Sequence, residues 1–154
     1  MNKNITFVFN EGRAKRLEKD TKGPKEFFYS YNIFQKDNLN TNLIELRSQK
    51  KGGFYFFFKL FRKVAKIPIY TEGLIDKDSL KVLYNSECLI ATNQNLGYSL
   101  LPLLKISRNK ELKFYTLIMG FLQNTRKNIF NKFMIKSLIK TATMLLFISK
   151  SELD

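Results

Sequence analysis

The chain has no histidine and only one cysteine among its 154 residues. Histidine is the commonest general base at neutral pH and a frequent zinc ligand, so its absence excludes the usual catalytic triads and most zinc chemistry. Any reaction would therefore depend on carboxylates, on lysines or on a partner domain. A single cysteine excludes a disulfide within the chain, and Cys88, inside the apolar run Cys88 to Ala91, is expected to be a small buried hydrophobic residue. We expect no metal and no cofactor.

Long apolar runs are also missing. No segment approaches the ~20 apolar residues that a membrane-spanning helix needs. Asn10 and Glu11 interrupt the first apolar run, so no N-terminal signal segment is visible. We therefore expect a cytoplasmic protein, and a peripheral position on the inner face of the cytoplasmic membrane is compatible with this pattern.

Acidic residues are few: 13 Asp and Glu stand against 27 Lys and Arg, which gives a net charge of +14. Such an excess predicts attraction to nucleic acid, anionic lipid or nucleotide-linked substrates. An AT-rich coding sequence, which favours Lys, Asn, Ile and Phe together, is a second explanation that stays open. Because the chain has no recognised nucleic-acid-binding motif and no aromatic platform on a strand, nucleic acid is the least favoured partner.

What the chain does have is a 44% share of hydrophobic residues, which suits one globular domain over residues 1–154. Strand-like runs alternate with helical patterns, and this predicts a Rossmann-like three-layer α/β/α domain with a mostly parallel sheet. The expected strands are Ile5 to Phe9, Leu43 to Leu46, Cys88 to Ala91, Phe114 to Met119 and Thr143 to Ile148, with Ile67 to Tyr70 as an edge strand or an extended link. The expected helices are Lys25 to Gln35, Phe54 to Ile67, Asp76 to Tyr84, Leu96 to Leu104 and Asn128 to Thr141.

The loop Asn10 to Arg13 follows the first expected strand. In open α/β folds ligands bind at the carboxyl edge of the sheet, where backbone N–H groups and the Arg13 guanidinium would favour an anion. The chain has neither the full Rossmann glycine fingerprint nor the Walker pattern, which disfavours dinucleotide and P-loop functions. The same residues also suit an ordinary turn between a strand and a helix.

Two other loops take the same position after a strand. Thr92 to Gly97 carries side-chain amides that suit sugar hydroxyls, although asparagines at such places more often cap helices. Gly120 follows the expected strand that ends at Met119. The candidate acceptor- or phosphate-binding residues are therefore Asn10, Glu11, Gly12, Arg13, Thr92, Asn93, Gly97 and Gly120.

The expected helix Phe54 to Ile67 is unusually rich in aromatic residues and cations. Helical spacing groups six apolar residues on one face: Phe54, Phe57, Phe58, Phe61, Val64 and Ala65. Four cations fall on another face and are the candidate membrane-surface residues: Lys59, Arg62, Lys63 and Lys66. The apolar face suits either the core or a lipid interface. Near an anionic leaflet each cation would contribute roughly 1 kcal/mol.

Five segments together resemble the N-terminal domain of GT-B glycosyltransferases of the family 4 (group 1) type. They are FVFNEGR (Phe7 to Arg13), KGPKEFFY (Lys22 to Tyr29), NLIEL (Asn42 to Leu46), LIATNQNLGYSLLPLLK (Leu89 to Lys105) and LLFISKSEL (Leu145 to Leu153). The resemblance implies an acceptor-holding domain that faces a second domain, which binds the nucleotide-sugar donor and carries the conserved glutamates. That second domain is not in this chain, and residues 1–154 are expected to end as a further helix begins.

Mapped by this resemblance, Gly12 would allow close backbone approach, Arg13 would contact an anion, and Asn10 and Glu11 would contact hydroxyls. Many members also place a histidine on a loop near the donor sugar, and this chain has none, so the resemblance assigns no catalytic base.

Three functions are therefore predicted as alternatives. The first is the N-terminal domain of a glycosyltransferase, either a split subunit or a fragment. It would bind a glycan or lipid-linked acceptor at a membrane surface in cell-envelope glycan synthesis, with the donor supplied by a separate domain. The second is a noncatalytic basic module that binds an anionic membrane surface. The third is an unrelated small α/β protein that binds a nucleotide or nucleic acid.

Overall fold

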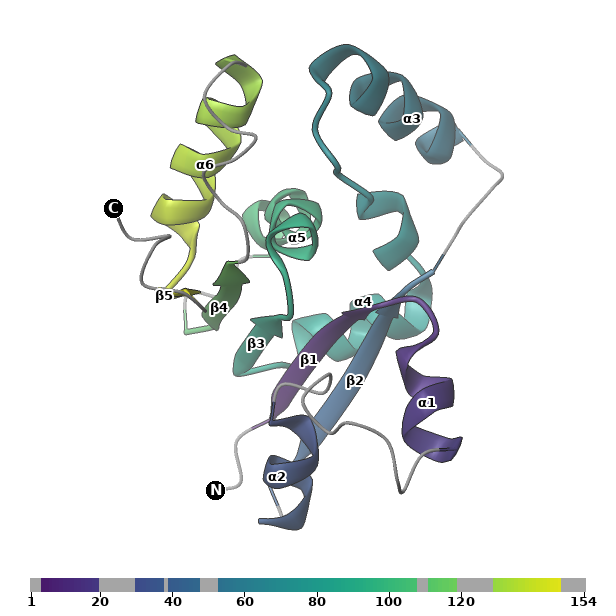
Figure 1. The fold of residues 1–154 in the computed structure, drawn as a ribbon, viewed down its shortest axis with the longest axis vertical. Helices are drawn as coiled ribbons and strands as arrows, with labels where there is room; N and C mark the ends of the chain where they lie inside the picture. The colour runs from purple at the N-terminus through teal and green to yellow at the C-terminus, as the bar shows by residue number, and fades with distance from the viewer. Residues whose placement is uncertain are drawn as a thin grey trace.

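The computed structural model describes residues 4–19, 30–37, 39–47, 53–107, 111–118 and 129–147, and the structural statements below concern these ranges. Five strands form one sheet in which every pair is parallel: β1 (Ile5–Asn10), β2 (Thr41–Leu46), β3 (Cys88–Ala91), β4 (Lys113–Ile118) and β5 (Met144–Phe147). The strand order is β2-β1-β3-β4-β5 (Figure 1). The chain thus first adds β2 on one side of β1 and then adds three strands on the other. This confirms the predicted Rossmann-like α/β fold.

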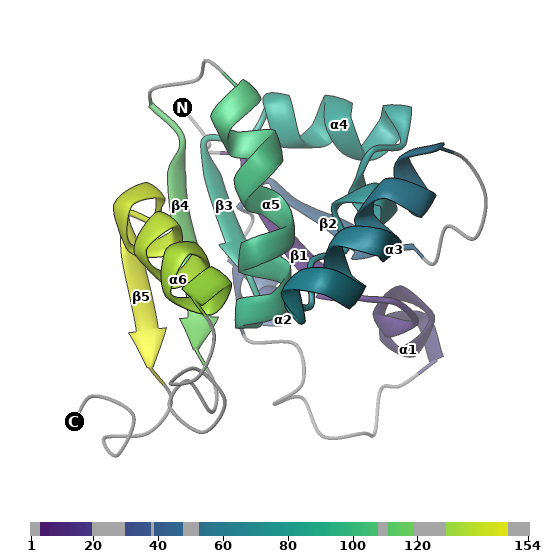
Figure 2. The same ribbon diagram turned by 90° about the horizontal axis from the view of Figure 1, so that it is seen from above.

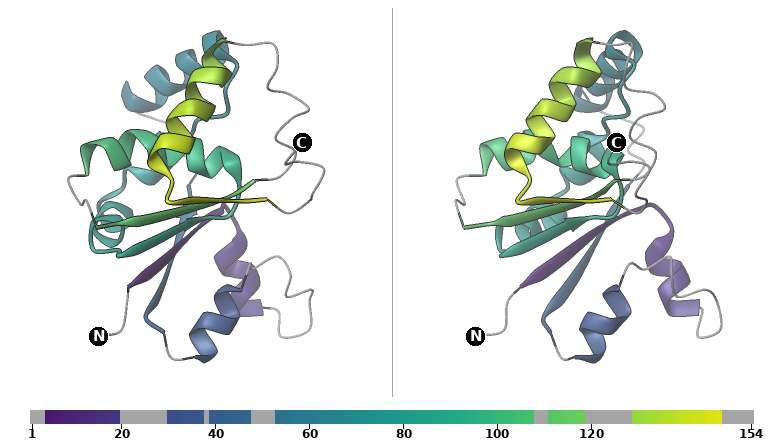
Figure 3. Two further views of the ribbon diagram at one scale, coloured as in Figure 1. Left: turned by 90° about the vertical axis from the view of Figure 1, so that its left-hand side faces the viewer. Right: turned by 60° about the vertical axis from the view of Figure 1, so that its left-hand side comes forward.

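Helices cover both faces of the sheet. They are α1 (Arg13–Lys19), α2 (Tyr31–Lys36), α3 (Gly53–Ala65), α4 (Lys77–Tyr84), α5 (Gln94–Ile106) and α6 (Ile129–Thr141), with a short 3₁₀ helix, η2 (Thr71–Leu74). Figure 3 shows α1 and α2 on one face and α3, α5 and α6 on the other. Seen from above, α5 lies between α6 and α3 (Figure 2). This arrangement gathers three long helices at one side of the molecule.

The two faces of the sheet differ in the size of their cores. On the α5 side, strand residues such as Val8, Leu89 and Phe114 pack with residues of α4, α5 and α6 in one large cluster. On the α2 side, a smaller cluster joins Phe7 and Phe9 to Tyr31, whose ring meets the Phe7 ring edge to face at 5.3 Å. Because β1 is buried on both faces, its residues Phe7, Val8 and Phe9 are all apolar rather than alternating with polar ones.

Of the two alternatives predicted for Ile67 to Tyr70, the structure shows the extended link: the buried side chains Ile67 and Ile69 pack into the core, and Pro68 lacks an N–H to donate. Two helices differ from the sequence prediction. Helix α1 was not predicted, because its sequence RAKRLEK has only Leu17 to mark a buried face. The expected helix at Lys25 to Gln35 is described only from residue 30, and its helical part begins at Tyr31; residues 25–29 lie outside the described ranges.

Gly73 in η2 lies so close to the end of β2 that no side chain fits at this position. A Cβ built on Gly73 would lie 2.4 Å from the carbonyl oxygen of Arg47 and 2.8 Å from Leu46 Cδ1. The amide of Arg47 donates to the carbonyl of Gly73 at 3.1 Å. The backbone of η2 thus packs directly against Arg47, the residue that follows β2. This close contact requires glycine at position 73.

We predict that Gly73→Ala lowers the free energy of unfolding by about 1–3 kcal/mol, because the added methyl group must displace backbone. The measurement is urea denaturation followed by circular dichroism. Gly53→Ala is the matched control, since nothing lies within 4 Å of a Cβ at Gly53 and alanine is the better helix former. Equal denaturation midpoints for Gly73→Ala and the wild type would contradict the prediction.

Candidate functional site

Helix α3 carries apolar side chains on two sides. One side faces the core through Phe58, Phe61 and the fully buried Ala65. The other side lies in solvent, where four apolar residues are between 53% and 69% exposed: Phe56, Phe57, Leu60 and Val64. Neighbours three and four residues apart form a continuous surface on a helix, and an exposed apolar surface marks an interaction site. The structure thus divides the apolar face that helical spacing grouped together: Phe58, Phe61 and Ala65 pack on the core, whereas Phe57 and Val64 are exposed.

Of the four predicted surface cations, three are exposed: Lys59, Lys63 and Lys66. Arg62 is different, because it forms an ion pair with Glu72 and donates to the carbonyl of Ile69 at 2.7 Å. The side chain of Glu72 is only 4% exposed, so Arg62 serves as the counter-ion of a buried carboxylate. Arg62 therefore differs from the three exposed lysines with which the sequence grouped it, because its guanidinium is held within the fold.

The segment after α3 is fastened to α5. The amide of Tyr70 donates to Ser99 Oγ at 2.8 Å, and the hydroxyl of Thr71 donates to the carbonyl of Ser99 at 2.7 Å. The guanidinium of Arg62 also lies over the Tyr70 ring, 4.6 Å from its centroid. These contacts hold the C-terminal end of α3 against α5, while the exposed side of α3 carries the four apolar residues named above.

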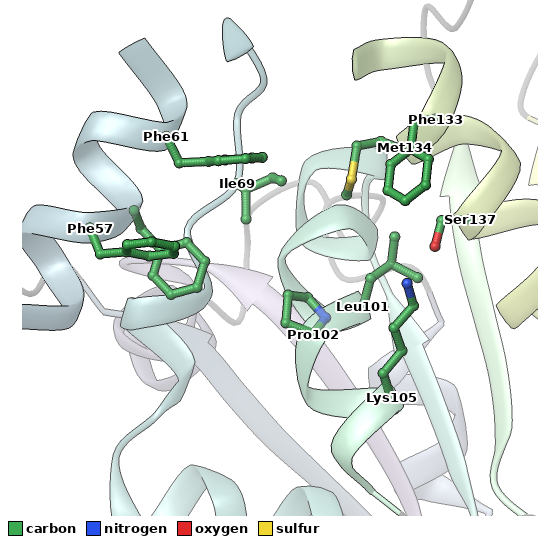
Figure 4. A pocket seen from close by; sticks show the side chains of 10 residues that line it. Phe57, Phe61, Ile69, Leu101, Pro102, Lys105, Phe133, Met134 and Ser137 are labelled. Atoms are coloured by element: carbon green, nitrogen blue, oxygen red, sulfur yellow. The ribbon is translucent and has the colours of Figure 1, made fainter. Parts of the chain in front are cut away.

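A pocket of about 330 Å³ opens between α3, α5 and α6. Figure 4 shows side chains from the three helices and from the link after α3 converging on it. Its lining consists of Phe57, Phe58, Phe61, Ile69, Leu101, Pro102, Lys105, Phe133, Met134 and Ser137. A neighbouring cavity of about 440 Å³ shares Phe61, Phe133 and Met134 with it. Among the described residues that line the 330 Å³ pocket, only Lys105 and Ser137 have polar side-chain groups.

The three helices around this pocket carry charges of one sign only. The sequences of α3, α5 and α6 contain no Asp or Glu. They contain three cations on α3, one on α5 and three on α6, and the α6 cations Lys132, Lys136 and Lys140 are all exposed. Lys105 Nζ lies 5.8 Å from the centroid of the Phe133 ring at the pocket edge. Among the described residues that line it, the pocket therefore combines an apolar interior with one cation, Lys105, at its edge.

The predicted loop Asn10 to Arg13 does lie at the carboxyl edge of the sheet. Gly12 has φ +87°, a conformation that side chains rarely adopt, and nothing lies within 4 Å of a Cβ built there. The amide of Ala14, in the first turn of α1, donates to the carboxylate of Glu45. The protein thus places its own anion at the start of α1, where a phosphate was expected to be favoured.

The loop after β3 is structural. Thr92 is buried, and its hydroxyl donates to the carbonyl of Val8 at 2.8 Å. Asn93 caps α5 by accepting the amide of Leu96 at 3.0 Å. Gly97 is buried where α5 meets β4 and α6, and a Cβ there would lie 2.8 Å from Thr116 Cγ2 and 3.3 Å from Leu138 Cδ1. The assignment of these residues to an acceptor site is therefore corrected for Thr92 and Gly97, whose side-chain positions face the core; Gly120 lies outside the described ranges.

The described residues offer no group of three or more metal-ligating side chains, and none of the helices in those ranges is long and apolar enough to cross a membrane. Burial raises the pKa of Tyr98 in α5 to about 12, so its phenol remains an uncharged core group. No protein-family model, no curated protein and no solved structure matches the chain.

We predict that Arg62→Gln lowers the free energy of unfolding by about 3 kcal/mol, because Glu72 would stay buried without its cation. Lys63→Gln changes the neighbouring, exposed residue and should stay within about 0.5 kcal/mol of the wild type. Urea denaturation of both variants measures the difference. If both variants unfold at the same urea concentration, Arg62 is an ordinary surface cation, as the sequence suggested.

Proposed function

We propose that this chain binds the surface of an anionic membrane through α3. The observation that carries the proposal is the exposed apolar row Phe56, Phe57, Leu60 and Val64, which lies beside the exposed cations Lys59, Lys63 and Lys66. A helix that lies in a lipid interface has this pattern, with apolar residues toward the acyl chains and lysines toward the headgroups. The site is proposed to lie on the inner face of the cytoplasmic membrane.

We predict that changing Lys59, Lys63 and Lys66 together to Gln weakens binding to vesicles that contain phosphatidylglycerol. At roughly 1 kcal/mol per cation the partition coefficient should fall about a hundredfold. Cosedimentation with vesicles measures this at several salt concentrations, and wild-type binding should itself weaken with salt.

Two controls separate this surface from total charge and total hydrophobicity. The triple change of Lys77, Lys81 and Lys113 to Gln removes the same charge from exposed positions on α4 and β4. Leu60→Ser on α3 should weaken binding, whereas Ile33→Ser on α2, which is 58% exposed, should not. Equal losses for the two lysine triples would mean that net charge alone drives binding, and the α3 site would be abandoned.

In a second candidate function, the chain binds the membrane and also binds the acceptor in a sugar-transfer reaction. Two observations favour it: the resemblance of five segments to GT-B glycosyltransferases, and a parallel sheet whose carboxyl edge carries the loop Asn10 to Arg13. In this proposal a separate domain binds the nucleotide-sugar, and the glycan or lipid-linked acceptor lies along the loop, with Arg13 toward its phosphate. A noncatalytic membrane module shares every feature of α3 but needs no such loop.

Sugar transfer and the noncatalytic alternative are separated by an activity measurement. We predict that the purified chain alone transfers no sugar from nucleotide-sugars, and that transfer appears when a donor-domain protein that copurifies with it is added. Arg13→Ala should then lower kcat/KM by about ten- to a hundredfold, as expected for the loss of a hydrogen bond to a charged group. Lys15→Ala, an exposed cation on α1, is the control. Turnover by the chain alone, or equal activity of both variants, would contradict this assignment.

A further inference from the structure

The pocket between α3, α5 and α6 has the interior of a site for a hydrocarbon chain. Its buried floor is formed by Ile69, Leu101 and Met134, and its edge by the exposed rings of Phe57 and Phe133. At about 330 Å³ it lies at the lower end of the roughly 300–1,000 Å³ typical of small-molecule sites. A sugar or a nucleotide would leave its hydrogen-bonding groups unpaired against this lining, and burying such groups without partners is costly.

The rim of the pocket favours an anionic headgroup. Lys105 lies at the edge beside the Phe133 ring, and the three surrounding helices carry cations without a single acidic residue. Lys132 and Lys136 of α6 are exposed, like Lys59 and Lys63 of α3, and Lys105 is the cation that lines the pocket among the described residues. A phosphate held at the edge would meet Lys105 and no negative charge from these three helices.

We propose that this pocket binds one hydrocarbon chain of a phosphate-bearing membrane lipid, with Lys105 facing the phosphate. The lipid comes from the membrane that α3 contacts, so the inference rests on the proposed membrane function. The exposed Phe57 belongs both to the apolar row of α3 and to the pocket edge, which makes the membrane-facing surface continuous with the pocket. A chain leaving the bilayer would therefore stay in contact with apolar side chains along its path.

The experiment uses the purified full chain and soluble single-chain probes below their micelle concentrations, with affinities measured by calorimetry. Dodecyl phosphate should bind, and decyl phosphate should bind roughly tenfold more weakly, because two fewer methylenes are buried. Dodecyltrimethylammonium should bind more weakly than dodecyl phosphate, and inorganic phosphate alone should not bind measurably. Equal affinity for the two alkyl phosphates would overturn a chain-filled pocket.

Variants locate the site. Ser137→Leu adds apolar volume inside the pocket and should weaken dodecyl phosphate binding at least tenfold. Phe133→Ser removes a ring that is 62% exposed and should also weaken it, which provides a second test if Ser137→Leu does not fold. Lys105→Gln should remove the preference for phosphate over trimethylammonium, whereas Lys113→Gln, an exposed lysine on β4, should keep it.

Failure of this inference can be distinguished from failure of the membrane proposal, because Leu60 and the lysines Lys59, Lys63 and Lys66 are not among the residues that line the pocket. If Ser137→Leu binds dodecyl phosphate like the wild type, the lipid-chain site is wrong even when vesicles still bind. If vesicle binding fails while alkyl phosphates bind in a Ser137-dependent way, only the membrane proposal is wrong. If no alkyl phosphate binds and Phe133→Ser instead dissociates a dimer, the pocket is occupied by a second copy of the chain and the lipid site is overturned.

Discussion

The ion pair between Arg62 and Glu72 is the interaction on which the rest of the candidate site depends. Burying the carboxylate of Glu72 in η2 would be costly without a cation, and Arg62 on α3 supplies one. The same guanidinium donates to the carbonyl of Ile69 in the link after α3. The next two residues, Tyr70 and Thr71, donate hydrogen bonds to Ser99 of α5. Together with the apolar contacts of Phe58, Phe61 and Ala65, Arg62 thus sets the position of α3 relative to α5, and that position defines the pocket between the two helices.

The anchoring explains how a helix can expose so many large apolar side chains. In most surface helices, the apolar stripe that attaches the helix to the core is also the part of the helix that is buried. Helix α3 is attached by Phe58, Phe61 and Ala65 together with a polar anchor at its last turn. The apolar row Phe56, Phe57, Leu60 and Val64 is more than half exposed and adds little to this attachment. Its exposure is the physical reason for proposing a binding role for it.

The strands were predictable from sequence because parallel strands buried on both faces are short, continuous apolar runs, as in Cys88–Ala91. The long helices were predictable from the helical spacing and the length of their apolar patterns. Whether a given face of a helix meets the core or the solvent was not predictable. Helical spacing placed Arg62 with the lysines, and only the tertiary position of Glu72, ten residues later, separates it from them. Gly97 looked like a loop glycine near a ligand, whereas its role is the close packing of α5 on Thr116 of β4. The pocket needs residues from three helices and the link after α3, so no local pattern could reveal it.

The distribution of charge argues against coding bias as the sole origin of the basic excess. A bias toward lysine codons would add cations throughout the chain and would leave the 13 acidic residues scattered among them. Acidic residues do occur on other described elements, such as Glu45 on β2, Asp78 on α4 and Glu87 before β3. They are absent from α3, α5 and α6, the three helices that surround the apolar pocket. Since a binding surface for anions is weakened by each carboxylate on it, three helices without a carboxylate suit the recognition of a phosphate-bearing lipid, and Glu72 beside them is neutralised by its ion pair with Arg62.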